Sequence, residues 1–273
     1  MSANVFELTD VHFAYRDTPA LAGLTLAIPA GQRVVLLGAN GSGKSTLLRL
    51  LDGLSFAQRG TVAAFGAPLT EERFVDNATA MAFRRRVGLV FQNPDVQLFN
   101  PTVFDELAFG PLQLGWPKPE ILARVGQALE SFSIAHLRDR SPHRLSGGEK
   151  KRVALAAVLV MEPEVLLLDE PTAALDPRSA SEIINLLVAA RHTGRTVITA
   201  THDLDIVADI ADHCVVMQAG AVVASGPPAR ILADVDLLVR TGLAHAHLHV
   251  HADGTVHRHH HLHAHGIGHV DKD

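Results

Sequence analysis

The chain has 273 residues, of which 47% are hydrophobic and 19% are charged, so it can form a globular domain with a core of its own. Its net charge is −5, and no basic run exceeds Arg84-Arg85-Arg86, so we expect no nucleic-acid partner. The single cysteine, Cys214, cannot form an internal disulfide, and the longest apolar run, residues 153–161, is about half the length that crosses a bilayer. A role at a membrane would therefore require a partner subunit.

The first part of the chain is predicted to be β structure. Apolar segments at residues 5–8, 11–15 and 24–28 are separated by turn-forming residues at 17–19 and 29–31. Tyr15 is the only tyrosine. Its ring can pack on a sheet face or stack on an adenine base, and this segment alone does not decide between the two.

A glycine-rich loop follows a short apolar strand at residues 33–37 and precedes a helix with apolar periodicity. The loop fits the pattern G-x-x-x-x-G-K-[ST], with glycines that let successive N–H groups turn inward. The start of the following helix adds partial positive charge, so the sequence predicts a polyphosphate site. Lys44 is placed for the β- and γ-phosphates and the Ser45 hydroxyl for Mg²⁺. The candidate nucleotide ligands here are Gly38, Ala39, Asn40, Gly41, Ser42, Gly43, Lys44, Ser45 and Thr46.

The middle of the chain is predicted to be mostly helical. Strands at residues 60–65 and 87–91 lead to a polar loop at 92–101, and a helical pattern then runs from 102 to about 132, with interruptions at 110–111 and 115–117. Before a further helix at 149–161 come Leu145, Ser146, Gly147, Gly148 and Glu149. The N–H groups there can form a second anion site or an ordinary helix cap. This stretch is too long for a single crossover, so we expect a helical subdomain over about 95–161.

Polar residues follow two further apolar strands. Residues 165–168 end in Asp169 and Glu170, and residues 195–200 end just before His202. Because the carboxyl ends of parallel strands line a ligand crevice, we expect these three side chains near the phosphate loop. Helices are predicted over 177–190, 203–212 and 228–241, and a hairpin over 215–223. The alternation predicts an α/β fold with a mostly parallel core sheet and an N-terminal antiparallel β portion.

In combination these motifs resemble the ATP-binding subunit of ABC transporters over about residues 4–225. Tyr15 corresponds to the aromatic loop, Gln92 to the Q-loop and His202 to the switch histidine, while residues 38–45, 145–149, 166–170 and 174–176 correspond to Walker A, the signature, Walker B and the D-loop. The signature usually ends in Gln, so Glu149 is a departure. Residues 91–99, 102–103 and 109–111 are similar to the ATPases of energy-coupling factor importers.

The resemblance implies a P-loop NTPase fold with an ATPase domain at 1–226, a C-terminal helix at 227–244 and a tail at 245–273. It implies ATP between two protomers, either a homodimer or a pair with a related ATPase. One protomer supplies Tyr15 and residues 38–46, and the other supplies Ser146, Gly147, Gly148 and Glu149. The implied roles are catalysis for Glu170, His202, Gln92 and Lys44, and Mg²⁺ binding for Ser45, Gln92 and Asp169.

The same resemblance implies a place at the cytoplasmic face of the cell membrane. A transmembrane scaffold subunit would dock in a groove near Gln92–Phe109, and membrane substrate-binding subunits would be contacted only indirectly. The cargo stays open between cobalt or nickel and another micronutrient such as a vitamin. Two other classes are a soluble ABC ATPase acting on ribosomes or DNA, and a metal-storage or sensor protein with secondary ATPase activity.

Eleven of the seventeen histidines lie between His245 and His269. Imidazoles at this density bind Ni²⁺, Co²⁺, Cu²⁺ or Zn²⁺, which favours the cobalt/nickel branch of the family. The tail either buffers or senses the transported metal, or is a disordered polar tail with incidental affinity. The candidate ligands are His245, His247, His249, His251, His257, His259, His260, His261, His263 and His265.

Overall fold

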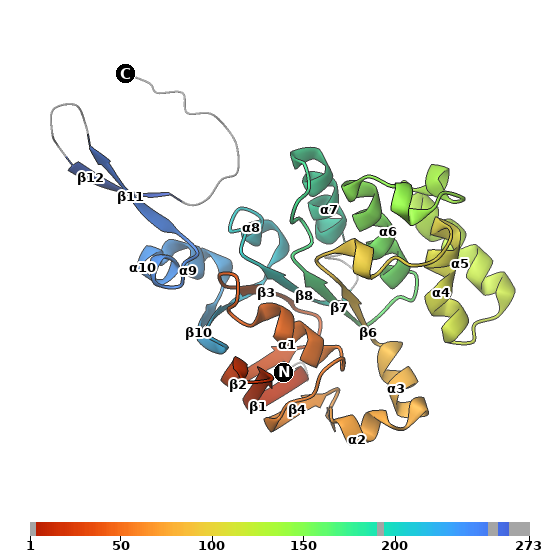
Figure 1. Ribbon diagram of the computed structural model, residues 1–273, viewed down its shortest axis with the longest axis horizontal. Helices are drawn as coiled ribbons and strands as arrows, with labels where there is room; N and C mark the ends of the chain where they lie inside the picture. The colour runs from red at the N-terminus through yellow and green to blue at the C-terminus, as the bar shows by residue number, and fades with distance from the viewer. Residues whose placement is uncertain (1–3, 190–193, 251–255, 262–273) are drawn as a thin grey trace.

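The computed structural model describes residues 4–189, 194–250 and 256–261 (Figure 1). A six-stranded sheet forms its centre, with the order β10-β9-β3-β8-β7-β6. Neighbouring strands are parallel except β10, which is antiparallel to β9. The strands are β3 (Arg33–Leu37), β6 (Val87–Val90), β7 (Val165–Asp169), β8 (Thr196–Thr201), β9 (His213–Gln218) and β10 (Ala221–Gly226).

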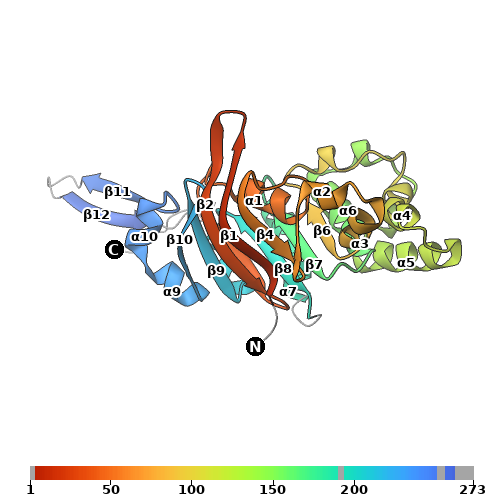
Figure 2. The ribbon, with the colours of Figure 1, turned by 90° about the horizontal axis from the view of Figure 1, so that it is seen from below.

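The core strands are buried along their whole length because both faces of the sheet are covered. Every residue of β3, β6, β7 and β8 is buried, as expected for parallel strands between two layers. Helix α1 (Lys44–Leu51) lies between this sheet and a second one (Figures 1 and 2). Leu47, Leu48, Leu50 and Leu51 of α1 belong to one buried cluster with residues of both sheets. The predicted α/β fold with a mostly parallel core is confirmed.

The second sheet is antiparallel, with the order β2-β1-β4-β5. Its strands are β1 (Asn4–Tyr15), β2 (Thr18–Pro29), β4 (Arg59–Ala64) and β5 (Ala67–Pro68). The two separate strands expected within residues 5–15 are one strand, whose register with β2 shifts between Leu8 and Val11. Asp10 has a φ of 50°, so the irregularity is absorbed inside the strand rather than ending it. The tip of the β1–β2 hairpin projects beyond the sheets (Figure 2).

The helical subdomain lies at one side of the core sheet, beyond β6 (Figure 1). It contains η1 (Pro94–Val96), α4 (Val103–Gln113), α5 (Lys118–Ser131), η2 (Ala135–Leu137), η3 (Pro142–Arg144) and α6 (Gly147–Leu159). The interruption predicted at Gly110-Pro111 was wrong, since α4 continues through both residues. Gly110 is needed for packing instead, because a Cβ there would lie 2.5 Å from Met161 Sδ. Helix α4 ends at Gln113, and residues 114–117, where Gly115 has a φ of 71°, separate it from α5.

The remaining elements include two short helices that the sequence analysis did not predict, α2 (Glu71–Phe74) and α3 (Asn77–Arg84). Helix α7 (Pro177–Ala189) falls where it was expected, whereas α8 (Val207–Ile210) is shorter than the predicted 203–212. The single helix predicted over 228–241 is two, α9 (Pro228–Ala233) and α10 (Val235–Arg240), because Asp234 caps the second by accepting a hydrogen bond from Leu237 N.

The chain then forms a hairpin of β11 (His245–Val250) and β12 (Val256–His261) next to α10 (Figures 1 and 2). No helix within the described ranges is both long and apolar enough to span a membrane.

Candidate functional site

The loop between β3 and α1 is shaped for an anion. Gly41 and Gly43 have φ values of 82° and 103°, which residues other than glycine rarely adopt. A Cβ at Gly43 would lie 2.6 Å from Ala20 O, so the chain approaches itself too closely there for a side chain. Ser42 Oγ is buried without a hydrogen-bond partner among the described residues. A cradle with an unpaired buried hydroxyl at a helix start fits a polyphosphate.

Lys44 is buried in this cradle. Its Nζ donates to Gly38 O at 2.6 Å and to Ala39 O at 3.3 Å, and lies 3.6 Å from Glu170 Oε1. Burial lowers the pKa of Lys44, while the charges of Glu170 and Asp169 act in the opposite direction. The ammonium therefore lies where an anion bound in the loop would meet it.

The carboxyl end of β7 brings two acidic side chains to the loop. Asp169 Oδ1 accepts a hydrogen bond from Ser45 Oγ at 2.9 Å, and burial raises the pKa of Asp169. Glu170 follows directly, with a φ of 44°. A left-handed conformation at a buried non-glycine residue is strain of the kind found at functional sites. This left-handed conformation turns the Glu170 side chain out of the strand, toward the phosphate loop and the end of β8.

Two groups at the end of β8 hold the Glu170 carboxylate. Thr201 Oγ1 donates to Glu170 Oε2 at 3.1 Å, and His202 Nδ1 lies 2.9 Å from Glu170 Oε1. The pairing of Asp169 with Ala200 across the parallel strands sets this alignment. The prediction that Asp169, Glu170 and His202 gather at the phosphate loop is thereby met in the geometry.

The oxygen atoms at this place fit a magnesium ion. The Ser45 hydroxyl and the Asp169 carboxylate are hard oxygen ligands of the type that Mg²⁺ prefers, and they already lie within hydrogen-bond distance of each other. The exposed side chain of Gln92 follows the adjacent strand β6. These three residues could hold the ion together with phosphate oxygens.

The sequence from Ser146 to Glu149 starts α6 as a capping box. Ser146 Oγ accepts from Glu149 N at 3.3 Å, and Ser146 N donates to Glu149 Oε2 at 2.7 Å. The latter bond lowers the pKa of Glu149. Glu149 is therefore engaged in shaping the loop.

The two glycines of this loop differ in their surroundings. A Cβ at Gly147 would meet only Leu175 Cδ2, at 4.0 Å, whereas one at Gly148 would lie 2.4 Å from Ser179 Oγ. Gly148 is thus required for packing against α7, and Gly147 faces open space. Helices α6 and α1 lie in different parts of the molecule (Figures 1 and 2). Within one chain, therefore, the structure does not bring this loop to the phosphate cradle.

Tyr15 lies at the end of β1 and is half-exposed. Its ring packs edge-on against Phe13 with centroids 5.0 Å apart, and its hydroxyl accepts a hydrogen bond from Arg49 Nη1 at 3.1 Å. Arg49 belongs to α1, so the ring is tied to the helix that starts in the phosphate loop. The ring therefore packs on Phe13 while part of it stays accessible, and stacking on an adenine base stays a prediction.

Lys151 was missed by the sequence analysis. It is buried in α6, and its Nζ donates to Gln92 O at 2.5 Å, Phe91 O at 3.2 Å and Glu170 O at 3.5 Å. Burial lowers the pKa of Lys151 to about 8. This amine joins α6 to the loop after β6 and to the backbone of Glu170. Its position in the sequence could have indicated a functional role. Gly148, Lys151 and Leu155 fall on one buried face of the helix, where a lysine is unusual.

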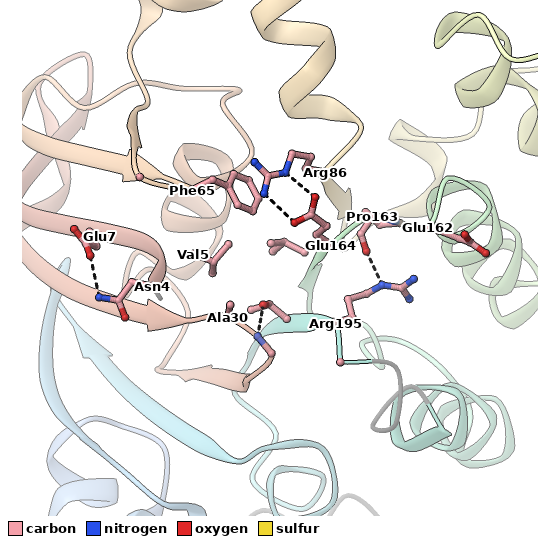
Figure 3. Close-up of a pocket in the computed structure, with 15 residues that line it drawn as sticks. Asn4, Val5, Glu7, Ala30, Phe65, Arg86, Glu162, Pro163, Glu164 and Arg195 are labelled. Carbon is pink, nitrogen blue, oxygen red and sulfur yellow. Dashed lines mark hydrogen bonds and ion pairs between the residues drawn. The ribbon is translucent and has the colours of Figure 1, made fainter. Parts of the chain in front are cut away.

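A hollow of about 900 Å³ lies at the opposite edge of the core sheet (Figure 3). It is lined by the amino ends of strands, and Arg86 pairs there with Glu164 at 2.7 Å while Arg195 Nε donates to Pro163 O. Ligands of parallel sheets bind at the carboxyl ends of the strands, where Asp169 and Glu170 lie. We therefore assign the chemistry to the phosphate-loop edge.

The predicted metal-binding histidines lie partly outside the described residues, namely His251, His263 and His265. The backbone positions of the others are described in β11 and β12. Within the described part of the chain, no group of three or more His, Cys, Asp or Glu side chains is placed to hold a metal ion.

Comparison with known proteins identifies the family. The ABC transporter family matches residues 21–173. The chain is 64% identical to the nickel import ATP-binding protein NikO of Rhodobacter capsulatus, covering 87% of this chain and 95% of that protein. It is also 48% identical to the energy-coupling factor transporter ATP-binding protein EcfA of Carboxydothermus hydrogenoformans, covering 87% and 86%.

Solved structures agree with these relatives. CbiO1 of Clostridium perfringens, part of the ABC transporter complex cbiONQ, has a TM-score of 0.74 at 40% identity over 87% of this chain and 93% of that one. The dimeric post-hydrolysis structure of the ATP-binding cassette MJ0796 with ADP and Pi has a TM-score of 0.73 at 25% identity over 82% and 98%. The chain therefore belongs to the ABC transporter family, as one of its ATP-hydrolysing subunits.

Proposed function

We propose that this chain is the ATPase subunit that powers a membrane importer of transition-metal ions, nickel or cobalt, by closing as a dimer on ATP. The observation that carries the proposal is the 64% identity to a nickel import ATP-binding protein over 95% of that protein's length. Similarity of this extent includes the helical subdomain as well as the ATP site.

In the proposed reaction each protomer positions ATP and a water molecule. The phosphate loop binds the β- and γ-phosphates, Lys44 neutralises their charge, and His202 stabilises the γ-phosphate. Glu170 orients the attacking water and accepts its proton, and Thr201 fixes the direction of that carboxylate through the hydrogen bond to Oε2. Ser45, Asp169 and Gln92 would hold Mg²⁺, which would supply charge neutralisation at the phosphate oxygens. Phosphoryl transfer of this kind depends mainly on positioning and electrostatic stabilisation.

The second half of the site comes from another protomer. Ser146, Gly147 and Gly148 lie at the start of α6, away from the same chain's α1 (Figure 1). Gly147 leaves the helix start open, so that backbone N–H groups can approach a phosphate. A symmetric pairing places each such loop over the partner's nucleotide, with either an identical or a related ATPase as the partner. The dimeric ADP- and Pi-bound relative supports this arrangement.

The membrane partner is proposed to bind at an apolar surface of the helical subdomain, which we call the docking surface. It consists of Val96, Phe99, Phe109 and Leu112, all of them exposed. Phe99 and Phe109 pack edge to face at 4.9 Å. An exposed apolar patch of this type marks an interaction site, and a scaffold subunit at the cytoplasmic face of the membrane fits it. Membrane substrate-binding subunits would be reached through that scaffold.

The docking surface is connected to the ATP site through hydrogen bonds. The buried Glu106 carboxylate accepts from Phe99 N at 3.0 Å and Asn100 N at 2.8 Å, which fixes the loop that carries Phe99. At the other end of this loop, Lys151 holds the carbonyl groups of Phe91 and Gln92. A change at Gln92 on ATP binding is thereby transmitted to the surface that meets the membrane subunit.

The test is uptake of radioactive nickel and cobalt by cells that lack their own importer and express this chain with its membrane subunits. Uptake that requires ATP and disappears with Lys44→Ala supports the proposal. Uptake of a vitamin instead of either metal would overturn the choice of cargo. ATP hydrolysis stimulated by metal without any membrane subunit would favour the metal-storage or sensor alternative.

A further inference from the structure

The two-residue turn between β9 and β10 lies against the phosphate loop. Because β9 ends at Gln218 and β10 starts at Ala221, the turn consists of Ala219 and Gly220. Their φ values are 48° and 78°. Positive φ at both central residues is characteristic of the primed turns that match the twist of an antiparallel pair. Alanine adopts such a value only with strain, so the surroundings of the turn hold it in this conformation.

Gly220 joins two segments that are distant from it in the sequence. Its N–H group donates to Ser42 O of the phosphate loop at 3.0 Å, and its carbonyl group accepts from Ala22 N of β2 at 3.0 Å. Strand β10 runs beside β2 in the fold (Figure 2), which brings the turn to this place. The turn therefore lies between the phosphate loop and the antiparallel sheet and is hydrogen-bonded to both.

The place where these segments meet has no room for a side chain. A Cβ at Gly220 would lie 2.7 Å from Ala20 O and 2.8 Å from Leu21 Cα, both in the backbone of β2. A Cβ at Gly43 would lie 2.6 Å from the same Ala20 O. A close-packed strand backbone cannot move aside as the end of a flexible side chain can. A side chain at Gly220 would therefore displace the turn and its hydrogen bond to the phosphate loop.

The hydrogen bond to Ser42 O sets the direction of one peptide group in the phosphate loop. The C=O and N–H groups of a trans peptide point in opposite directions. Holding Ser42 O against the turn thus directs the Gly43 N–H to the other side of the loop. Glycine-rich loops bind phosphates through N–H groups of this kind, so we expect the turn to orient a group that contacts the nucleotide.

We propose that Gly220 is a positioning residue for ATP binding, which orients the peptide group between Ser42 and Gly43 through its own N–H group. Gly220 does not touch the reacting atoms, and it lies outside the motifs that the sequence analysis assigned to the ATP site. This role rests on the proposed ATP site at the phosphate loop and is independent of the transported cargo.

The experiment measures the affinity of the full chain for ATP with Mg²⁺ by nucleotide titration. Gly220→Ala is expected to weaken ATP binding about tenfold or more, since a hydrogen bond to a charged group is lost or misdirected. Melting temperatures are recorded for all variants, because the new Cβ also disturbs packing.

Two control variants separate the loss of affinity from the loss of stability. Gly60→Ala has a similar φ, 82°, and its Cβ also meets strand backbone, 2.2 Å from Asp10 O. Gly66→Ala has a φ of 76°, and its Cβ meets nothing within 4 Å. We expect Gly60→Ala to melt at lower temperature and both controls to bind ATP as tightly as the unmodified chain. Equal losses of affinity in Gly220→Ala and Gly60→Ala would overturn the proposal, because affinity would then follow stability.

Lys44→Ala tests the ATP site in the same titration. If Lys44→Ala weakens ATP binding and Gly220→Ala does not, the positioning role is wrong while the ATP site stands. If neither variant weakens binding, the site at the phosphate loop is wrong as well.

A second measurement uses the unmodified chain, so it does not depend on the folding of Gly220→Ala. Amide hydrogen exchange is followed by NMR with and without ATP. A bound phosphate fixes the peptide group whose oxygen accepts from Gly220 N, so exchange at Gly220 is expected to slow about fivefold or more. Exchange at Gly66 should not change. Exchange at Gly220 that does not respond, while the Gly43 amide becomes protected, would overturn the proposal.

Discussion

Replacing Glu170 by Gln separates its chemical role from its structural one. The carboxylate makes two hydrogen bonds, from Thr201 Oγ1 to Oε2 and with His202 Nδ1 at Oε1. A glutamine of the same shape keeps one acceptor oxygen, and a hydroxyl or a neutral imidazole can accept from its amide. The cost at these two hydrogen bonds is therefore about the free energy of one hydrogen bond, about 1 kcal/mol. The substitution also removes the negative charge that lies 3.6 Å from Lys44 Nζ.

The catalytic cost of the same change is larger. Removal of a general base slows a reaction by about 10²–10⁴-fold, which corresponds to about 3–5 kcal/mol of activation free energy. We expect Glu170→Gln to hydrolyse ATP slower by this factor, to bind ATP as tightly as before, and to accumulate as a closed dimer. Phosphate release, nucleotide titration and size-exclusion chromatography measure the three effects. Hydrolysis at the unmodified rate would refute the assignment of Glu170 as the base.

Three further variants test other parts of the site. Lys44→Ala removes the cation of the cradle and should weaken ATP binding by about 10- to 150-fold, which corresponds to the free energy of a hydrogen bond to a charged group. Unchanged ATP affinity in a nucleotide titration would contradict this prediction. Gly147→Ala should abolish ATP hydrolysis without loss of thermal stability. Gly148→Ala should abolish hydrolysis and also lower the melting temperature, because its Cβ meets Ser179. Equal melting temperatures of the two variants would argue against this difference in packing between Gly147 and Gly148. Because the pKa of Lys151 is lowered to about 8, hydrolysis should fall as pH rises through 8, and Lys151→Arg should move that fall to higher pH. Burial of the charged amine costs stability below about pH 8, and the cost fades toward pH 10.5, so melting temperature should not fall together with activity. Identical pH–rate profiles for the two proteins would exclude Lys151 as the group responsible.

The sequence was sufficient for the core sheet and the phosphate loop because the chemistry there is local. Strands buried on both faces consist mostly of apolar residues, and the glycine positions of the loop follow from its conformation. Asp169, Glu170 and His202 could be placed together because strand ends in a parallel sheet meet at one edge.

What could not be predicted depends on contacts between distant segments. Helix α4 continues through Gly110-Pro111 because Met161 packs against Gly110, and nothing local to residues 110–111 indicates that neighbour. The contacts of Lys151 with carbonyl groups of Phe91, Gln92 and Glu170 likewise join three segments. The pairing of histidines across β11 and β12 is a matter of register, which composition leaves open.

The central claim is that each ATP is hydrolysed by two protomers together, and a mixing experiment tests it most directly. Lys44→Ala disables the phosphate cradle and Gly147→Ala disables the opposing loop, so each variant alone should be inactive. Mixed dimers would have one site with both defects and one intact site. After subunit exchange we expect about a quarter of the unmodified rate, because half of the dimers are mixed and each has one working site of two. A mixture that stays as inactive as its components would contradict the account.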